Sequence, residues 1–274
     1  MPSRSSSPID TPEPAALLHA FSRDHPVSWG DPLPSAAEIA ALHSTRATTR
    51  SLWLLERAVG AEPKVTADFL AALPADGSAY RLDSRIKSPT SLARKLEDAR
   101  QKGRQRMPED VLRYTVLVKS PEQLVAAARH TVDELCRSGW QVGYAMQSYT
   151  DGSRYKGLHA YLKAHGIDSV EVQFHSVASV QVKEATTKWY EIERSALRTS
   201  EERTAARATC VQLSATLPAP SDIEDLTALG GRTVAVRNYS ESRESGGQTT
   251  ALGSTAPANT LRATTIKRDD GIKR

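Results

Sequence analysis

The chain has 274 residues, 39% of them hydrophobic, and a formal net charge of +4. This length suits one large or two small domains, and the charge is too small to predict that the whole protein binds a polyanion. Cys136 and Cys210 lack metal-ligand spacing, which disfavours a disulfide framework or a zinc site and fits a reducing cytosol. No apolar run approaches the roughly 20 residues of a membrane-spanning helix, and the polar N-terminal region is unlike a secretory signal. We therefore expect a cytoplasmic protein that contacts no membrane.

The first predicted elements follow a Pro-rich stretch. Residues 1–34 hold seven of the fifteen prolines, and we predict a disordered arm there. Residues 35–77 are predicted to form a helical extension, in which Ser35 caps the first helix. A turn over 74–77 separates this extension from the rest of the chain.

From residue 78 helices alternate with strands, which predicts an α+β domain over residues 78–210. We expect a mixed sheet of about five strands flanked by helices. The strands are predicted over 80–86, 111–118, 140–149, 155–163 and 169–174, and the helices over 88–102, 121–138 and 179–209. Residues 211–237 are a short C-terminal segment, and the Ser-, Gly- and Thr-rich tail over 238–274 is predicted to be disordered.

A basic junction between a strand and a helix is the most distinctive feature of the sequence. Residues 81–106 contain nine Lys or Arg and three acidic residues. Arg85 and Lys87 are expected on one face at the end of a strand, with Ser91 and Lys95 on the first turns of the helix. Because a helix N-terminus offers free N–H groups and the positive end of the dipole, such a junction suits a polyphosphate. The same charges are also typical of a solvated helix face or a nucleic-acid surface.

Two acidic residues are candidates for metal or proton chemistry. Asp110 precedes the apolar strand 111–118, and a carboxylate that faces a phosphate pocket is a candidate Mg²⁺ ligand. The alternative is an aspartate that only begins a strand. Glu171 and Gln173 alternate with apolar residues in 169–174, so they share one face. Such a face is usually just solvated, but a second acid there could complete a two-carboxylate metal site or accept a proton from a hydroxyl.

An aromatic residue follows a predicted turn. Tyr155 offers a ring face for stacking on a base, with Lys156 as a cation and Gly157 as a small residue for close approach. His159 completes this block. The alternative is that Tyr155 is an ordinary strand aromatic.

In their order along the chain, these residues resemble the synthetase domain of the RelA/SpoT alarmone synthetases. That family has an Arg-x-Lys-x-x-x-Ser-x-x-x-Lys block, an Asp that opens a hydrophobic strand, a Tyr-x-x-x-His block and a Glu-x-Gln strand before a helix. The matching positions, within about residues 80–195, are Arg85, Lys87, Ser91, Lys95, Asp110, Tyr155, His159, Glu171 and Gln173. The resemblance implies a nucleotidyltransferase-like fold with a helical N-terminal extension.

The resemblance also implies an activity, the Mg²⁺-dependent transfer of the β,γ-pyrophosphate of ATP to the 3′-hydroxyl of a guanine nucleotide. Asp110 and Glu171 would bind Mg²⁺, and Glu171 would also activate the hydroxyl. Tyr155 would stack on the acceptor base, with His159 and Gln173 shaping its site. The ATP phosphates would be held by Arg85, Lys87, Ser91 and Lys95.

Several positions depart from the family pattern on the acceptor side. Arg113 and Thr115 replace the Gly and Arg of the family's Asp-x-x-Gly-x-Arg, and His175 stands where the family has Arg. These variants resemble the divergent, toxin-type branch, whose members can use an adenine nucleotide or the 3′ end of tRNA as acceptor. The substrates implied are therefore ATP and a nucleotide or tRNA, and the partner implied is an antitoxin protein, with no DNA. The chain has no His-Asp pair, so we expect no companion hydrolase domain.

Two other functions fit parts of the sequence. A non-catalytic module that binds nucleotides or RNA would keep the fold and the phosphate pocket. A plain nucleic-acid surface would need only the charges of residues 81–106. The presence of both Asp110 and Glu171 favours the enzyme, because a binding module does not need two metal carboxylates.

Overall fold

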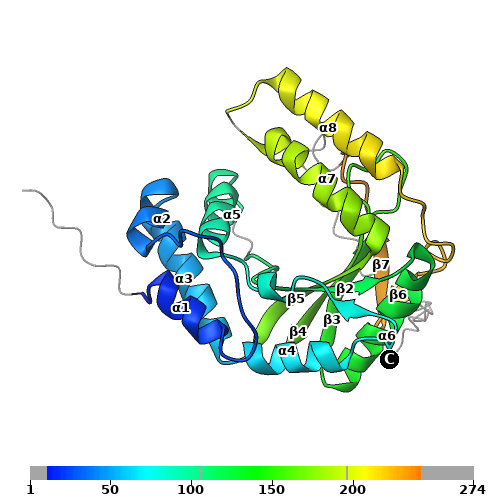
Figure 1. Cartoon of the computed structure of the whole chain (residues 1–274), viewed down its shortest axis with the longest axis horizontal. Coiled ribbons are helices and arrows are strands. Elements are labelled where there is room, and N and C mark those ends of the chain that lie inside the picture. The colour runs from blue at the N-terminus through cyan, green and yellow to red at the C-terminus, as the bar shows by residue number, and fades with distance from the viewer. Residues whose placement is uncertain (1–10, 105–106, 196, 242–274) are drawn as a thin grey trace, which may run out of the picture.

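The computed structural model describes residues 11–104, 107–195 and 197–241 (Figure 1). The helices are α1 (Pro14–Phe21), α2 (Ala36–Leu42), α3 (Thr45–Val59), α4 (Glu62–Ala71), α5 (Pro89–Gln101), α6 (Leu124–Arg137), α7 (Val177–Arg194) and α8 (Ser200–Ala215), with the 3₁₀ helices η1 (Leu82–Ser84) and η2 (Pro121–Gln123). The strands are β1 (Ser78–Ala79), β2 (Leu112–Val118), β3 (Gln141–Gln147), β4 (Leu158–Ala164), β5 (Ile167–Ser176), β6 (Ala228–Leu229) and β7 (Arg232–Val236).

One mixed sheet forms the centre of the fold, in the order β1-β2-β5-β4-β3-β7-β6. β5 is parallel to β2, and β7 is parallel to β3, whereas the other neighbours are antiparallel. The predicted α+β class, with a mixed sheet flanked by helices, is confirmed. The sheet has seven strands rather than about five. β1 and β6 have two residues each, too few to give a sequence pattern.

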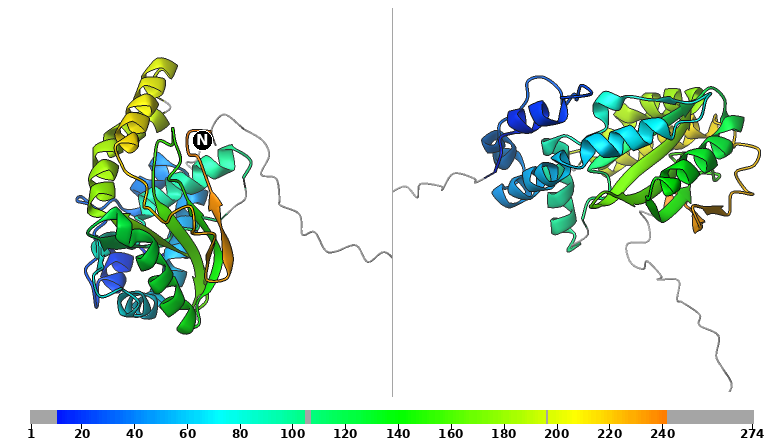
Figure 2. Two further views of the ribbon diagram at one scale, coloured as in Figure 1. Left: turned by 90° about the vertical axis from the view of Figure 1, so that its right-hand side faces the viewer. Right: turned by 90° about the horizontal axis from the view of Figure 1, so that it is seen from below.

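The two faces of the central strands differ in chemistry. On one face, Val172 of β5 and its partner in register, Tyr114 of β2, belong to the buried core. The Tyr114 ring packs on Phe69 of α4 (centroids 4.7 Å apart), so α4 covers this face together with α6 (Figure 1). Gln173 points to the opposite face, where it meets Lys183 of α7. The α7–α8 hairpin therefore lies on the polar face of the sheet, on the side away from α4 and α6 (Figure 1 and Figure 2).

A buried ion pair connects the N-terminal helices to the sheet. The side chain of Arg85 is only 1% exposed, and its Nε donates to Oε1 of Glu62 at 2.6 Å. Its other four N–H groups donate to the backbone carbonyls of Phe21, His25, Pro26 and Leu82 at 2.9–3.1 Å. All five donors of the guanidinium are therefore satisfied inside the protein.

The disordered arm predicted over residues 1–34 is wrong for residues 14–34. α1 begins with Pro14 at its first position and buries Leu17 and Phe21, four residues apart on one helix face. The carbonyls that follow α1 are the partners of Arg85, which fixes the chain there. Residues 1–10 lie outside the described residues.

The C-terminal part also differs from expectation. β7 pairs with β3 through Ala145↔Val234 and two further positions, so the sheet extends beyond the predicted domain end at residue 210. The single long helix predicted over 179–209 is two helices, because Thr199 caps α8 in a capping box with Glu202. Within the described ranges, none of the helices has both the length and the apolar character to cross a bilayer. The predicted disordered tail lies outside the described residues from 242 onward.

Replacing Arg85 with Ala is expected to destabilise the protein by about 3–5 kcal/mol, because it leaves the Glu62 carboxylate buried without its cation. The matched control is Arg81→Ala, whose ion pair with Glu184 (3.3 Å) has side chains 64% and 50% exposed. That control should change the free energy of unfolding by about 1 kcal/mol or less. Urea unfolding of both variants measures the difference, and equal losses would contradict an anchoring role for Arg85.

Candidate active site

The basic junction brings two lysines onto one carboxylate. Ser88 caps α5, and its hydroxyl accepts a hydrogen bond from the Ser91 N–H at 3.3 Å. This start places Ser91 on the first turn of the helix and Lys95 one turn later. The Nζ atoms of Lys87 and Lys95 lie 2.7 Å from Oδ2 and Oδ1 of Asp110, respectively. The structure therefore brings these predicted site residues together at the start of β2.

The charges of this cluster depend on one another. Burial alone would raise the pKa of Asp110, but the attraction of Lys87 and Lys95 outweighs it and lowers the pKa. Burial also lowers the pKa of Lys87, against the attraction of Asp110. Two ammonium groups face one carboxylate, so the cluster keeps positive charge with which it can bind phosphate oxygens.

Arg85 does not belong to this cluster. Its guanidinium points to Glu62 of α4 and is fully bonded within the protein. The prediction that Arg85 binds ATP phosphates is wrong, and the cause is local. Residues 80–86 do not form the expected strand, since η1 and one bridge at Ile86 replace it. The two-residue alternation that would put Arg85 and Lys87 on one face therefore does not apply.

A second cluster surrounds Glu171 on the polar face of the sheet. β4 runs antiparallel to β5, which pairs Tyr161 with Glu171 and His159 with Gln173. Nδ1 of His159 and the Tyr161 hydroxyl donate to Oε1 of Glu171 at 2.9 and 3.0 Å. Burial alone would raise the pKa of Glu171, but the hydrogen bond and charge of His159, with Gln173 and Arg113, hold it below its usual range. The hydrogen bonds around Glu171 thus favour its ionised form, which both a proton acceptor and a ligand of Mg²⁺ require.

Tyr155 continues this hydrogen-bonded series. Its hydroxyl lies 2.8 Å from Nε2 of His159 and 3.1 Å from Nε2 of His175. His159 therefore bridges Tyr155 and Glu171, with Nε2 toward the Tyr155 hydroxyl and Nδ1 toward the carboxylate. Gly157 leaves room for this arrangement, since a Cβ there would lie 2.6 Å from the Tyr155 hydroxyl oxygen. All the residues predicted on the acceptor side, Tyr155, His159, Glu171 and Gln173, therefore lie together.

Sequence reasoning left some neighbouring side chains unassigned. Tyr161 is two residues after His159, so strand alternation could have placed it on the same face. Lys183 donates to Oε1 of Gln173 at 3.0 Å, and nothing in its polar helix singles it out. The Tyr239 ring lies 5.4 Å from that of Tyr155, brought there by the chain after β7, a strand that was not predicted.

The two clusters occupy successive levels of the β2–β5 pair. Arg113 is in register with Glu171. Asp110 precedes Arg113 by three residues, which is about 10 Å of extended chain. Across residues 11–104, 107–195 and 197–241, no group of three or more His, Cys, Asp or Glu is placed to hold a metal. An ion shared by Asp110 and Glu171 would therefore need substrate oxygens to complete its coordination.

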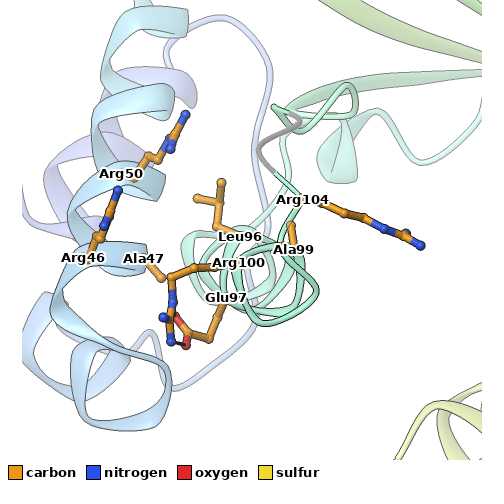
Figure 3. A pocket seen from close by; sticks show the side chains of 9 residues that line it. Arg46, Ala47, Arg50, Leu96, Glu97, Ala99, Arg100 and Arg104 are labelled. Atoms are coloured by element: carbon orange, nitrogen blue, oxygen red, sulfur yellow. Dashed lines mark hydrogen bonds and ion pairs between the residues drawn. The ribbon is translucent and has the colours of Figure 1, made fainter.

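Arg94, Arg100 and Arg104, in α5 and just after it, lie outside both clusters. Arg94 pairs with Asp98 at 3.5 Å, and Arg100 pairs with Glu97 at 2.5 Å, both along α5. A separate pocket of about 380 Å³ lies between α3 and α5 (Figure 3). It is lined by Arg46, Ala47, Arg50, Leu96, Glu97, Ala99, Arg100, Gly103 and Arg104. The described part of the basic run is thus spread over several places rather than gathered in one patch.

Comparison with known proteins gives only distant matches. No family model matches the sequence, and no curated protein does. The solved structures that match include the Type VI effector Tas1 in complex with its immunity protein (18% identity over 61% of this chain and 92% of that chain, TM-score 0.38). They also include small alarmone synthetase 1 from Bacillus subtilis (15%, 58% and 86%, TM-score 0.36) and a GTP pyrophosphokinase family protein from Streptococcus pneumoniae (14%, 60% and 80%, TM-score 0.34). Because these TM-scores are below 0.5, function has to be inferred from the residues of the site.

Replacing Gly157 with Ala is expected to destabilise the protein by about 1–3 kcal/mol, because the new methyl group overlaps the Tyr155 side chain. In a Tyr155→Ala background the same replacement should have a smaller effect, since the overlapping atoms are gone. A double-mutant cycle measured by thermal unfolding gives the coupling energy. Strictly additive effects would show that Tyr155 does not pack against Gly157.

Proposed function

We propose that the protein transfers a pyrophosphoryl group from ATP to the 3′-hydroxyl of a nucleotide. The observation that carries this proposal is the ionised, buried Glu171 on the strand next to the cluster of Lys87, Lys95 and Asp110. A base for a hydroxyl and cations for a polyphosphate are two requirements of this chemistry. The motif residues, which resemble those of the alarmone synthetases, support the same reaction.

The donor would bind at the start of α5. Lys87 and Lys95 would exchange part of their contact with Asp110 for phosphate oxygens, and Ser91 would contribute from the first turn. The N-terminal end of the helix dipole favours the same anion. Arg85 takes no part, because its donors are already bonded.

Asp110 fits Mg²⁺ as a hard oxygen ligand beside a phosphate site, since Mg²⁺ is usually held by one or two carboxylates and substrate phosphates. Glu171 would be the second carboxylate ligand, reached across the bound phosphates. The ion would neutralise charge on the transferred group. The protein's own contribution is to position Asp110 between the two lysines and to keep it ionised.

The acceptor hydroxyl would be placed at Glu171. The hydroxyl oxygen would attack the β-phosphorus of ATP. The bond from that phosphorus to the α,β-bridging oxygen would break, so that AMP leaves, and the hydroxyl proton would pass to Glu171. His159 and Tyr161 hold the carboxylate in place. Gln173 and Tyr155 would contact the acceptor, with the ring of Tyr155 stacked on its base.

The acceptor class follows from the departures at Arg113, Thr115 and His175. We propose a guanine nucleotide, an adenine nucleotide or the 3′ end of tRNA, which are the acceptors known in the family that the motifs resemble. A toxin-type member would inhibit growth, and a neutralising antitoxin protein would then be its partner. The decisive experiment incubates the protein and Mg²⁺ with γ-labelled ATP and each of GDP, GTP, ADP, ATP and deacylated tRNA, and identifies the labelled product. ATP binding without any transfer would favour the non-catalytic binding module instead.

We expect Asp110→Asn and Glu171→Gln each to reduce transfer by at least about a hundredfold, because the first removes the phosphate-side carboxylate and the second the base. Initial rates of label transfer measure the loss. Asp98→Asn on the exposed face of α5 and Glu191→Gln on α7 are matched controls that should keep near-normal rates. Thermal unfolding checks that each variant is folded, and a folded variant with a normal rate would remove that residue from the mechanism.

Replacing Lys87 or Lys95 with Ala should weaken ATP binding by about tenfold or more, since a charge-assisted hydrogen bond to phosphate is worth about 1.5–3 kcal/mol. Arg104→Ala is the control, because Arg104 lines the separate pocket between α3 and α5. Calorimetric titration with a non-hydrolysable ATP analogue measures the affinities. Equal losses at all three positions would instead indicate diffuse attraction by the whole basic run.

A further inference from the structure

A second polar pocket lies beside the proposed site, between β2, α7 and the segment that precedes Arg85. Its volume is about 140 Å³, several times the space that one water molecule needs. The chemistry-bearing residues of its lining are Tyr80, Arg81, Arg113, Thr115, Lys183 and Glu184. The sequence analysis placed Arg113 and Thr115 on the acceptor side without giving either a ligand, and it gave no role to the other four residues.

The charges of the pocket do not balance. Arg81 and Tyr80 both contact the Glu184 carboxylate, at 3.3 and 2.6 Å, so this carboxylate is already paired at the edge of the pocket. Among the described residues, no carboxylate forms an ion pair with Arg113 or Lys183. The hydrogen-bond partner of Lys183 is the neutral amide of Gln173. Two cations therefore line the pocket without an ion-paired carboxylate among the described residues.

Their positions bring these cations into one pocket beside Glu171. Arg113 is in register with Glu171 on the parallel neighbour strand. Burial lowers the pKa of the Lys183 ammonium, and the charge of Arg113 lowers it further, whereas Glu171 acts in the opposite direction. Burial is the largest cause, and the pKa of Lys183 falls to about 8. Repulsion of this kind is relieved when an anion binds between the cations.

Glu171 acts on both cations through its charge, but among the described residues it forms no ion pair with either of them. Its Oε1 accepts from His159 and Tyr161. Thr115, two residues after Arg113 and therefore on the same strand face, adds a hydroxyl to the pocket wall. A planar guanidinium, an ammonium and a hydroxyl around a small cavity are the donors that a phosphate group takes.

We infer that Arg113 and Lys183 form a phosphate-binding site that holds a phosphate group of a nucleotide substrate next to Glu171. The identification of the ligand as a substrate rests on the proposed function, whereas the binding of phosphate by this pocket does not. The phosphates are those of the ATP donor or those that the acceptor nucleotide carries. In either case Arg113 is the cation that β2 contributes to the substrate site. It lies one strand spacing from Glu171, the proposed base.

The test measures binding of inorganic pyrophosphate to the full chain by calorimetry, which needs no catalysis. Arg113→Gln and Lys183→Gln should each weaken binding by about tenfold or more. Arg129→Gln on α6 and Lys188→Gln on α7 are charge-matched controls, and they should stay within about twofold of the unchanged protein. Arg113→Lys keeps the charge and should restore part of the affinity, whereas a loss caused by misfolding would not respond to charge.

Separate titrations with ATP, GDP and ADP distinguish the two sources of the phosphate. A loss confined to ATP assigns the pocket to the donor, and a loss confined to GDP or ADP assigns it to the acceptor. Unchanged pyrophosphate affinity in both Gln variants, or no pyrophosphate binding by the unchanged protein, would overturn the inference. If the variants lose binding while label transfer from ATP is never observed, the phosphate site stands and the proposed function fails. If Asp110→Asn loses label transfer but Arg113→Gln binds pyrophosphate normally, the proposed function stands and the phosphate site fails.

Discussion

The buried contact between Arg85 and Glu62 is the interaction on which the rest of the structure depends. The Arg85 guanidinium bonds to Glu62 of α4 and to the chain after α1, while the Arg85 backbone lies at the edge of the sheet. The Arg85 carbonyl accepts from the N–H of Arg113 at 2.7 Å, and the N–H of Lys87 donates to Val111 at 3.0 Å. Because these bonds fix the chain on both sides of Ile86, Lys87 is delivered to Asp110. The N-terminal helices are therefore part of the support of the site, and Arg85 acts on it through the backbone.

The two halves of the site are built in different ways. The half with Asp110 stands on a loop and the start of a helix, where lysine side chains can exchange a carboxylate for a phosphate. The half with Glu171 stands on adjacent strands, where His159 and Tyr161 fix the carboxylate from a neighbouring backbone. A rigid base beside an adjustable cation cluster suits a reaction in which the donor is bound first by charge and the hydroxyl is then oriented.

Sequence reasoning predicted what local patterns determine. The cap at Ser35, the apolar strand 111–118 and the alternation around Glu171 all reappear, because each depends on residues a few positions apart. The role of Arg85 was wrong because charge alone does not separate a buried arginine from a ligand arginine, and its partner Glu62 is 23 residues away. β7 was missed because its pairing with β3 joins distant parts of the chain, a contact that leaves no local pattern. Mg²⁺ and the acceptor stay predictions, since no contact among the described residues tests them.

The burial of Arg85 has a consequence for the charge of the site. A polyphosphate substrate needs several cations near its oxygens, and the motif that the sequence resembles would supply one of them at Arg85. In this protein that charge is neutralised by Glu62 and enclosed by backbone carbonyls. Arg113 stands on the polar face at a position where the family pattern has glycine, and Lys183 reaches the same face from α7. The positive charge of the site is thus kept, but it is moved from the junction to the middle of the sheet, closer to Glu171. A substrate bound by these cations, as proposed, would sit further along β2 than the resemblance alone implies.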